Sequence, residues 1–205
     1  MERKTSTKLW KIPLATVIPI RVTERAQALA SEVLNLGDIA IDATAGKGRD
    51  TAFLAQTVGP TGWVHSFDIQ AEAIESTQKL LVASGLINRV TLHHLSHAEI
   101  STALPESHRG KISVALFNLG YLPGSDQKII THPESTSTAL QSAFNELKTG
   151  GRLICVAYTG HPGGKEESQV VEKFAEKCEK DGNSVEKIGY TAHQPKPWVL
   201  VVTRD

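Results

Sequence analysis

The sequence lacks three features that would each indicate a particular class of protein. It has no net charge, since 22 lysine and arginine residues balance 22 aspartate and glutamate residues, so any nucleic-acid binding must be local. It has only two cysteines, Cys155 and Cys178, which give no metal spacing or disulfide framework and indicate a reducing compartment. No apolar run approaches the roughly 18 residues of a membrane span, and residues 1–20 lack the apolar core of a signal peptide. We therefore expect a cytoplasmic protein without a membrane segment.

The length of 205 residues suits one domain, which would bury roughly 70% of its unfolded surface. The first 25 residues carry six basic residues against two acidic ones, with Trp10 among the lysines. Such a segment can follow a phosphate backbone, although a charged segment of this kind is more often a solvated tail. The expected organisation is a basic segment over residues 1–22 and a single domain over residues 23–205.

The stretch over residues 39–51, IAIDATAGKGRDT, organises the rest of the chain. Its apolar start, small residues around Gly46 and Gly48, and helical end predict a strand, a glycine-rich turn and a helix. The glycines allow the backbone to approach a ligand, and the free N–H groups at the helix start favour polar or anionic groups. Asp50 or Thr51 is expected to cap the helix. The turn therefore predicts a site for a nucleoside-bearing ligand.

An acidic residue follows the second predicted strand, which covers residues 63–67. Asp68 lies 20 residues beyond Gly48, a distance at which an acid can accept hydrogen bonds from a ribose diol. Gln70 is expected to contact the same nucleoside. The alternative is that Asp68 only caps the following helix, over residues 71–81.

Three histidines occur within five residues after the short third strand, over residues 90–92. Their spacing on a strand exit, with no nearby carboxylate or cysteine, argues against a metal site. The loop after the third strand of a doubly wound sheet closes over the base of a bound nucleoside, which favours Ser96 and His97 as base or cofactor contacts. A polar loop without any contact is the alternative.

A continuous apolar run over residues 112–117 predicts a strand that is buried on both faces. The loop after it, NLGYLPG, offers the amide of Asn118 and the aromatic ring of Tyr121 to a planar substrate, since ligands bind at the carboxyl ends of such strands. An ordinary turn would explain the glycine and the proline, but not the combination. The loop after the next strand contains His161, a candidate substrate contact or proton acceptor that could also be structural.

The remaining pattern completes an alternation of strands and helices. It predicts helices over residues 23–36, 134–147 and 166–180, a turn at residues 149–151, and strands over residues 153–157, 184–190 and 198–203. About seven strands, with helices on both faces and the last strand antiparallel, match the α/β Rossmann-like fold of class I S-adenosylmethionine-dependent methyltransferases. The dinucleotide motif G-x-G-x-x-G fails, because Thr51 occupies the position of the third glycine.

Several segments together resemble the rRNA methylase family typified by the bacterial protein YtqB, the MnmM-type tRNA methyltransferases. The resemblance extends from about Thr23 to the end, and its NLGYLPG and GHPGG stretches are far more specific than a glycine turn. One departure is Lys47, which stands where the family pattern DATxGNG has asparagine. The resembling segments are DATAGKGRDT (42–51), FDIQ (67–70), SHA (96–98), FNLGYLPG (117–124), GHPGGKEE (160–167) and the terminal HQPKPWVL.

The resemblance implies that a methyl group is transferred from S-adenosylmethionine to the exocyclic amine of 5-aminomethyl-2-thiouridine at the tRNA wobble position. The glycine turn would approach the methionine end of the cofactor, Asp68 would hold the ribose, and Ser96 and His97 would border the adenine. Asn118 would orient the amine, Tyr121 would face the uracil, and His161 would accept the released proton. The cofactor-binding set is Asp42, Gly46, Lys47, Gly48, Asp68, Gln70, Ser96 and His97, and the catalytic set is Asn118, Tyr121 and His161.

Other functions stay open at this stage. The acceptor of a methyltransferase could be ribosomal RNA or a small molecule, since a neutral chain does not require RNA. A small NAD-dependent oxidoreductase would use the same turn and acid, and a nonenzymatic RNA-binding module could retain the fold. The sequence leaves a homodimer open and does not show how an anticodon would be bound.

Overall fold

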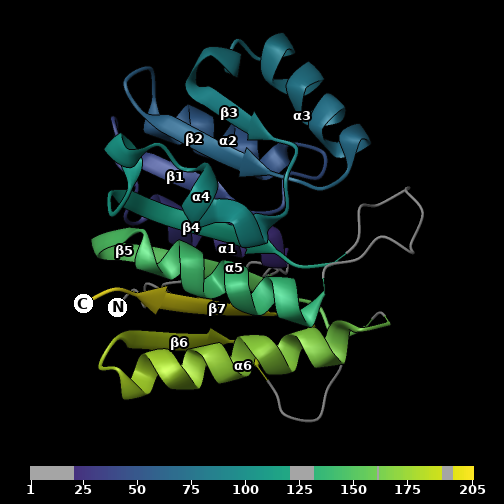
Figure 1. The fold of residues 1–205 in the computed structure, drawn as a ribbon, viewed down its shortest axis with the longest axis vertical. Coiled ribbons are helices and arrows are strands. Elements are labelled where there is room, and N and C mark those ends of the chain that lie inside the picture. Colours follow the sequence, from purple (N-terminus) through teal and green to yellow (C-terminus); the bar gives the residue numbers. More distant parts are fainter. Residues whose placement is uncertain (1–20, 121–131, 161, 191–195) are drawn as a thin grey trace, which may run out of the picture.

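The structure is a computed structural model that describes residues 21–120, 132–160, 162–190 and 196–205. A single sheet crosses the molecule, with helices on both of its faces (Figure 1). None of the helices in these ranges combines the length and the hydropathy that crossing a bilayer would require. Tyr121 and His161, two of the predicted catalytic residues, lie outside the described residues.

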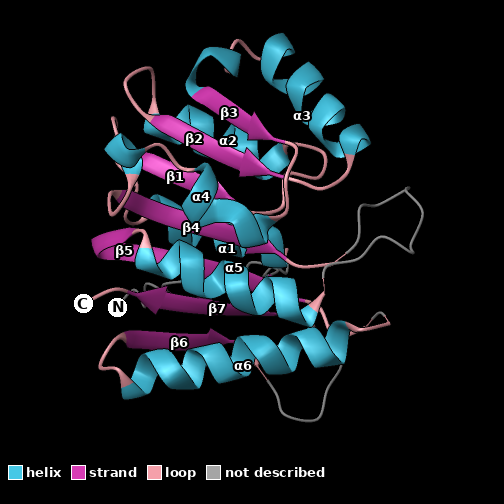
Figure 2. Cartoon of the chain, viewed as in Figure 1, coloured by secondary structure: helices cyan, strands magenta, loops and turns pink. Residues whose placement is uncertain are grey.

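The sheet has seven strands in the order β3-β2-β1-β4-β5-β7-β6. The strands from β3 to β5 are parallel, whereas β7 runs antiparallel to both β5 and β6. This confirms the mixed sheet that the sequence predicts, and the last strand inserts between its neighbours (Figure 2). The strands are β1 (Ile39–Asp42), β2 (Trp63–Phe67), β3 (Val90–His93), β4 (Ile112–Asn118), β5 (Leu147–Ala157), β6 (Ser184–Ile188) and β7 (Trp198–Thr203).

Two hydrophobic layers fill the space between the sheet and the helices. One packs α4, α5 and α6 against the sheet, and the other packs α1, α2 and α3 against the opposite face. The strand β4 serves both layers, and its first six residues are buried, which is why its sequence is continuously apolar. The helices are α1 (Val22–Ser31), α2 (Arg49–Val58), α3 (Ala71–Ala83), α4 (Ile100–Ala103), α5 (Pro133–Asn145) and α6 (Gly164–Lys180), with short 3-10 turns η1 (Ile87–Arg89), η2 (His97–Glu99) and η3 (Glu106–His108).

The first helix is shorter than predicted, and its cap differs. The helix α1 ends at Ser31 rather than near Leu36, and its N-cap is Arg21 rather than Thr23. The backbone N–H of Arg21 donates to the carboxylate of Glu24 at 3.2 Å, which stabilises the start. At the other end Arg152 donates to the carbonyl oxygen of Leu29 at 3.0 Å. A contact from β5 therefore occupies a carbonyl that a longer helix would use.

The predicted turn at residues 149–151 is wrong, because these residues belong to β5. Gly150 adopts a φ of 75°, and its N–H donates to the carbonyl oxygen of Arg204 at 2.7 Å. The register between β4 and β5 shifts between Ile112 and Val114. The glycines thus form an irregularity inside a continuous strand, where the sequence signal resembles that of a turn.

Candidate active site

The candidate site lies at the carboxyl ends of β1, β2 and β4, where the strand order changes direction. The strand β1 pairs with β2 on one side and with β4 on the other, and such a switch point leaves a crevice where ligands bind in open α/β sheets. The turn over residues 43–48 follows β1, Asp68 follows β2, and Asn118 ends β4. The fold thus brings together three features that are far apart in the sequence.

The two glycines of the turn have different surroundings. Gly46 and Gly48 adopt φ values of 52° and 79°, a region that residues with a Cβ rarely occupy. A Cβ on Gly48 would lie 2.8 Å from the Cα of Thr77 in α3. Gly48 therefore lacks a side chain because α2 and α3 pack closely there, which is a structural reason beyond the predicted approach of a ligand. Lys47, between them, is exposed.

The cap of α2 is Gly48, so the prediction that Asp50 or Thr51 caps this helix is wrong. The helix begins directly after the left-handed glycine, which places Thr51 inside its first turn. The Thr51 hydroxyl donates to the Asp42 carboxylate at 2.5 Å and lies 2.9 Å from the Ser66 hydroxyl. Thr51 therefore ties the start of α2 to β1 and β2.

Asp42, at the end of β1, is 1% exposed. Besides the hydroxyl of Thr51, its carboxylate accepts the backbone N–H of Thr44 at 3.1 Å. Burial, and then the nearby charge of Asp50, raise the pKa of Asp42 to about 7, against the lowering effect of the two hydrogen bonds. With these two partners, the Asp42 carboxylate holds the glycine turn and the start of α2 in place.

Asp68, directly after β2, is held in place by two backbone groups. The N–H of Gly46 donates to Oδ2 at 2.9 Å, and the N–H of Gln70 donates to Oδ1 at 2.9 Å. Gln70 is the N-cap of α3 but makes no side-chain cap hydrogen bond. Asp68 thus stabilises the start of α3, in keeping with the alternative interpretation that Asp68 caps this helix. Each oxygen still has a lone pair for another donor, so a bound diol remains compatible with this arrangement.

Ser96 and His97 begin the short turn η2, and each has an internal partner. The Ser96 hydroxyl accepts the backbone N–H of Ala98 at 3.2 Å and caps η2. His97 is 7% exposed. Burial lowers its pKa to about 4, opposed by a hydrogen bond with the backbone of Ala43. His97 is therefore neutral at physiological pH and links η2 to the glycine turn.

Two exposed apolar residues beside these loops were missed by the sequence reasoning. Ile69 follows Asp68 and is 51% exposed, and Leu95 precedes Ser96 and is 38% exposed. The two loops are adjacent, since the ring Nε2 of His94 lies 3.0 Å from the carbonyl oxygen of Ile69. Apolar side chains that stay exposed beside polar ones suit the faces of a planar ligand. In the sequence, the only indication of these two residues is that each is adjacent to a predicted cofactor contact, Asp68 or Ser96.

Asn118 is the point where the glycine turn meets β4. Its backbone N–H donates to the Thr44 hydroxyl at 2.8 Å, and its side-chain Nδ2 lies 3.4 Å from Oδ2 of Asp50. The other oxygen of Asp50 accepts a hydrogen bond from the Gln27 side chain at 2.7 Å. The sequence pattern around Asp50 indicates only a helix cap, and no local pattern indicates a role for Gln27.

The histidine run separates in space. His94 contacts Ile69 and His97 contacts Ala43, whereas His93 joins a different cluster. Within the part of the chain that the structure describes, no group of three or more His, Cys, Asp or Glu side chains is arranged to hold a metal ion.

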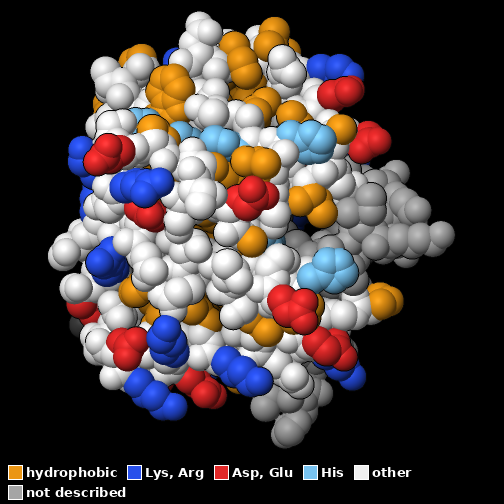
Figure 3. Space-filling model, viewed as in Figure 1, with side chains coloured by type: hydrophobic (Ala, Val, Ile, Leu, Met, Phe, Trp, Pro, Cys, Tyr) orange, Lys and Arg blue, Asp and Glu red, His pale blue; other side chains and the backbone are white. Residues whose placement is uncertain are grey.

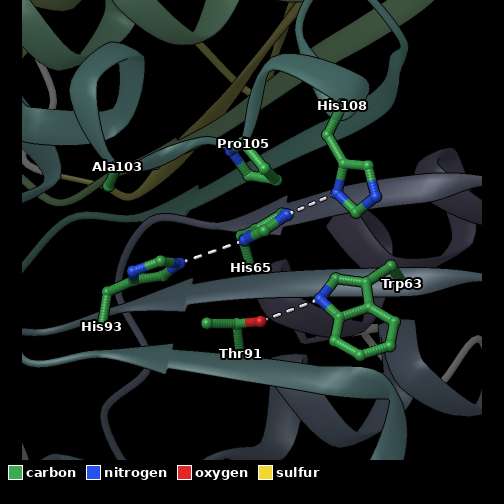
Figure 4. Close-up of a pocket in the computed structure, with 7 residues that line it drawn as sticks. All are labelled: Trp63, His65, Thr91, His93, Ala103, Pro105 and His108. Carbon is green, nitrogen blue, oxygen red and sulfur yellow. Dashed lines mark hydrogen bonds between the residues drawn. The ribbon is translucent and has the colours of Figure 1, made fainter.

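That other cluster centres on His65 in β2 and lines a cavity of about 370 Å³ (Figure 4). Nδ1 of His65 lies 3.0 Å from Nε2 of His93, and its Nε2 lies 2.8 Å from Nδ1 of His108. His65 uses its two nitrogens for two different partners, so the three rings form a chain and do not converge on a point. Burial, followed by the neighbouring rings, lowers the pKa of His65 to about 3. The other lining residues are Trp63, Thr91, Ala103 and Pro105.

Comparison with known proteins gives a consistent assignment. The family model described as "Putative rRNA methylase" matches residues 64–204. A chloroplastic tRNA (mnm(5)s(2)U34)-methyltransferase of Arabidopsis thaliana is 43% identical over 162 residues, which cover 75% of this chain and 58% of that protein. The chain thus spans less than two thirds of the length of this relative.

Two solved structures cover 90% of this chain. A protein from Clostridium thermocellum described as a "putative rRNA-methylase" superposes with a TM-score of 0.83 at 35% identity, over 97% of its own chain. A methyltransferase from Streptococcus mutans in complex with SAH superposes with a TM-score of 0.78 at 30% identity, over 98% of its own chain. The chain therefore belongs to the rRNA methylase family and has the fold of class I S-adenosylmethionine-dependent methyltransferases.

Proposed function

We propose that this protein is an S-adenosylmethionine-dependent methyltransferase that methylates the exocyclic amine of 5-aminomethyl-2-thiouridine at the wobble position of tRNA, giving 5-methylaminomethyl-2-thiouridine. The observation that carries the proposal is the 43% identity with a tRNA (mnm(5)s(2)U34)-methyltransferase. It is supported by the hydrogen bonds that join the glycine turn to Asp68 and to Asn118 at the carboxyl ends of β2 and β4.

The residues of the candidate site fit S-adenosylmethionine. Asp68 is oriented by two backbone N–H groups and keeps acceptor capacity for the ribose hydroxyls. The exposed apolar side chains of Ile69 and Leu95, with Ser96 and the neutral His97 nearby, suit an uncharged adenine. The turn at Gly46 to Gly48, supported from beneath by Asp42, would hold the methionine end. When bound, the cofactor supplies an electrophilic methyl group on a sulfonium.

The task left to the protein is to orient and desolvate a primary amine. Methyl transfer is an in-line displacement, and a neutral amine is already a good nucleophile, so alignment can account for much of the rate. Asn118 would hold the amine, because its side chain stands at the carboxyl end of β4 and its backbone is fixed by Thr44. We assign Tyr121 to the face of the uracil and His161 to the acceptance of the proton that the methylated ammonium releases after the transfer.

Lys47 replaces the asparagine of the family pattern, and its side chain is exposed. We propose that the cofactor is held at this position through the backbone of the turn, so the replacement is tolerated. Gln70 would add a side-chain contact to the same ligand from the start of α3.

The proposed macromolecular partner is the anticodon region of tRNA. Positive and negative side chains are interspersed on the face of the molecule in Figure 3, in keeping with the balanced total charge. We therefore assign the phosphate contacts to the basic segment over residues 1–22, ahead of a single methyltransferase domain over residues 23–205. We place the activity in the cytoplasm, to which two buried free cysteines are suited. Sedimentation with and without tRNA tests whether the protein is a homodimer.

The decisive experiment is mass analysis of wobble nucleosides after the protein and S-adenosylmethionine are incubated with tRNA that carries the unmethylated amine. We expect 5-aminomethyl-2-thiouridine to gain one methyl group. Labelled methyl transfer to ribosomal RNA or to a small molecule instead would reassign the acceptor, and no transfer to any RNA would favour a binding module. Thermal stabilisation by NAD, but not by S-adenosylhomocysteine, would favour an oxidoreductase.

A further inference from the structure

Asp50 lies where three elements meet at the candidate site. It belongs to the first turn of α2, yet its two oxygens face other elements: Oδ1 accepts a hydrogen bond from Gln27 of α1 at 2.7 Å, and Oδ2 lies 3.4 Å from the amide nitrogen of Asn118 at the end of β4. Residues 27, 50 and 118 are thus joined through one carboxylate. Binding of the cofactor's ribose and adenine, as proposed above, does not use this group.

The surroundings of Asp50 leave its charge incompletely neutralised. Burial raises its pKa, and hydrogen bonds from Gln27 and Asn118, with the charge of Arg49, oppose this. Gln27 and Asn118 are uncharged. Among the described residues, the charged or titratable groups that face Asp50 are Arg49 on its own helix, Asp42 from β1 and Tyr158 after β5. The Asp50 charge contributes to raising the pKa of both Asp42 and Tyr158.

The proposed substrate needs such a group. A primary alkylamine is mostly an ammonium ion at neutral pH, as the ordinary lysine pKa of about 10.4 illustrates, and an ammonium ion has no lone pair for attack. An aminomethyl group on an electron-poor ring loses its proton more readily than lysine does. A partly desolvated carboxylate next to the amide that orients the amine would attract the cation and accept its proton.

We propose that Asp50 binds the ammonium group of the substrate and removes one of its protons, and that Gln27 is a positioning residue that aims the Asp50 carboxylate at this group. The inference rests on the proposed function. The ammonium gives one proton to the carboxylate and becomes a neutral amine. The amine lone pair then forms the N–C bond to the methyl carbon while the C–S bond breaks, and its electron pair remains on sulfur. The product is a secondary ammonium ion, and Asp50 returns its proton to solvent.

The test compares Asp50→Asn with the wild type over a range of pH, using tRNA that carries the aminomethyl group. At neutral pH we expect kcat to fall by roughly 10²–10⁴-fold, the usual range for an acid–base group. As the pH rises, the variant should recover, because the free amine then forms without help. S-adenosylhomocysteine binding, measured by calorimetry, should be unchanged.

Two further variants complete the design. Gln27→Leu removes one donor to Asp50, so the acid limb of the kcat profile should move to higher pH while cofactor binding is kept. Asp181→Asn makes the same acid-to-amide change at the exposed C-cap of α6 and should leave the profile of the wild type unaltered. If Asp50→Asn does not fold, the Gln27→Leu profile alone decides, and an unmoved acid limb overturns the inference.

The outcomes separate this inference from the proposed function. If the wild type methylates the wobble amine but Asp50→Asn has the same pH profile, the inference fails and the function stands. A large loss of S-adenosylhomocysteine binding in Asp50→Asn would also overturn it, by assigning the carboxylate to the cofactor. A wild type that does not methylate the wobble amine would overturn the function and the inference together.

Discussion

Hydrogen bonds from neighbouring groups fix the position of the main polar residues at the candidate site. Asp68 illustrates this, since two backbone N–H groups fix its carboxylate before any ligand arrives. Asn118 is fixed through its backbone by Thr44. The sequence located both residues correctly at strand ends, because a polar residue after an apolar run is a local signal. It could not show the groups that orient them.

The first prediction separates cofactor binding from turnover. Asp68→Ala removes two acceptor oxygens, each worth about 1.5–3 kcal/mol when charged, and should abolish S-adenosylhomocysteine binding in calorimetry. Asn118→Ala should lose turnover while binding is retained. Asp68→Asn keeps one acceptor oxygen and should bind with intermediate affinity. Turnover like that of the wild type in both alanine variants would refute the assigned roles.

The second prediction concerns Gly48, where conformation and packing both exclude a side chain. Gly48→Ala should lower the free energy of unfolding by about 1–2 kcal/mol for the left-handed backbone and by roughly 1–3 kcal/mol more for the contact with Thr77. Gly85 provides the matched control, because its φ is 68° but a Cβ there would meet nothing within 4 Å. Gly85→Ala should show only the first effect in urea denaturation, and equal losses would contradict the packing argument.

Among the elements, α5 and α6 are joined by a buried hydrogen bond near their starts. The Thr136 hydroxyl donates to Glu167 at 2.6 Å, and both residues are buried, at 0% and 2% exposure. Each helix begins at the edge of the sheet that carries the candidate site, after β4 and β5 respectively. The contact therefore links the starts of the two helices. Residues 31 positions apart give no sequence signal for it.

The third prediction tests this contact by removing the donor. Thr136→Val keeps the volume but leaves the buried carboxylate of Glu167 without this partner, which should cost about 1–3 kcal/mol of unfolding free energy. Thr138→Val is the matched control on the same helix, since the exposed Thr138 hydroxyl bonds only to the carbonyl oxygen of Glu134. Thermal or urea denaturation should show a loss for Thr136→Val and almost none for Thr138→Val.

At the scale of the whole molecule, buried histidines make stability depend on pH. The pKa of His65 is lowered to about 3 and that of His97 to about 4, both chiefly by burial. Between these values and the ordinary value of 6.5 the unfolded chain binds more protons, so stability falls as the pH falls through this window. The pKa of Asp42 is raised to about 7. The folded chain therefore binds the extra proton at this residue, and the contribution of Asp42 to stability rises as the pH falls.

The fourth prediction isolates one histidine from this sum. Below pH 6.5 the wild type should lose up to about 1.4 kcal/mol more per pH unit than His65→Gln, because the glutamine variant has one titrating group fewer. The contribution of Asp42 is present in both proteins and cancels. Equal slopes for wild type and His65→Gln in urea denaturation would contradict the buried neutral state.

The sequence by itself determined the order of the strands and helices, the glycine turn and the polar residues at the ends of β2 and β4. These follow from hydrophobic periodicity and from turn chemistry, which act over a few residues. Tertiary structure decided the rest. Arg152 donates to the carbonyl oxygen of Leu29 near the end of α1, Gly150 lies inside β5, and Thr77 fills the space at Gly48. Gln27 and Asn118 meet at Asp50 only through the tertiary fold. Gln27 is separated from Asp50 by 23 positions and Asn118 by 68 positions, so no local pattern encodes these contacts.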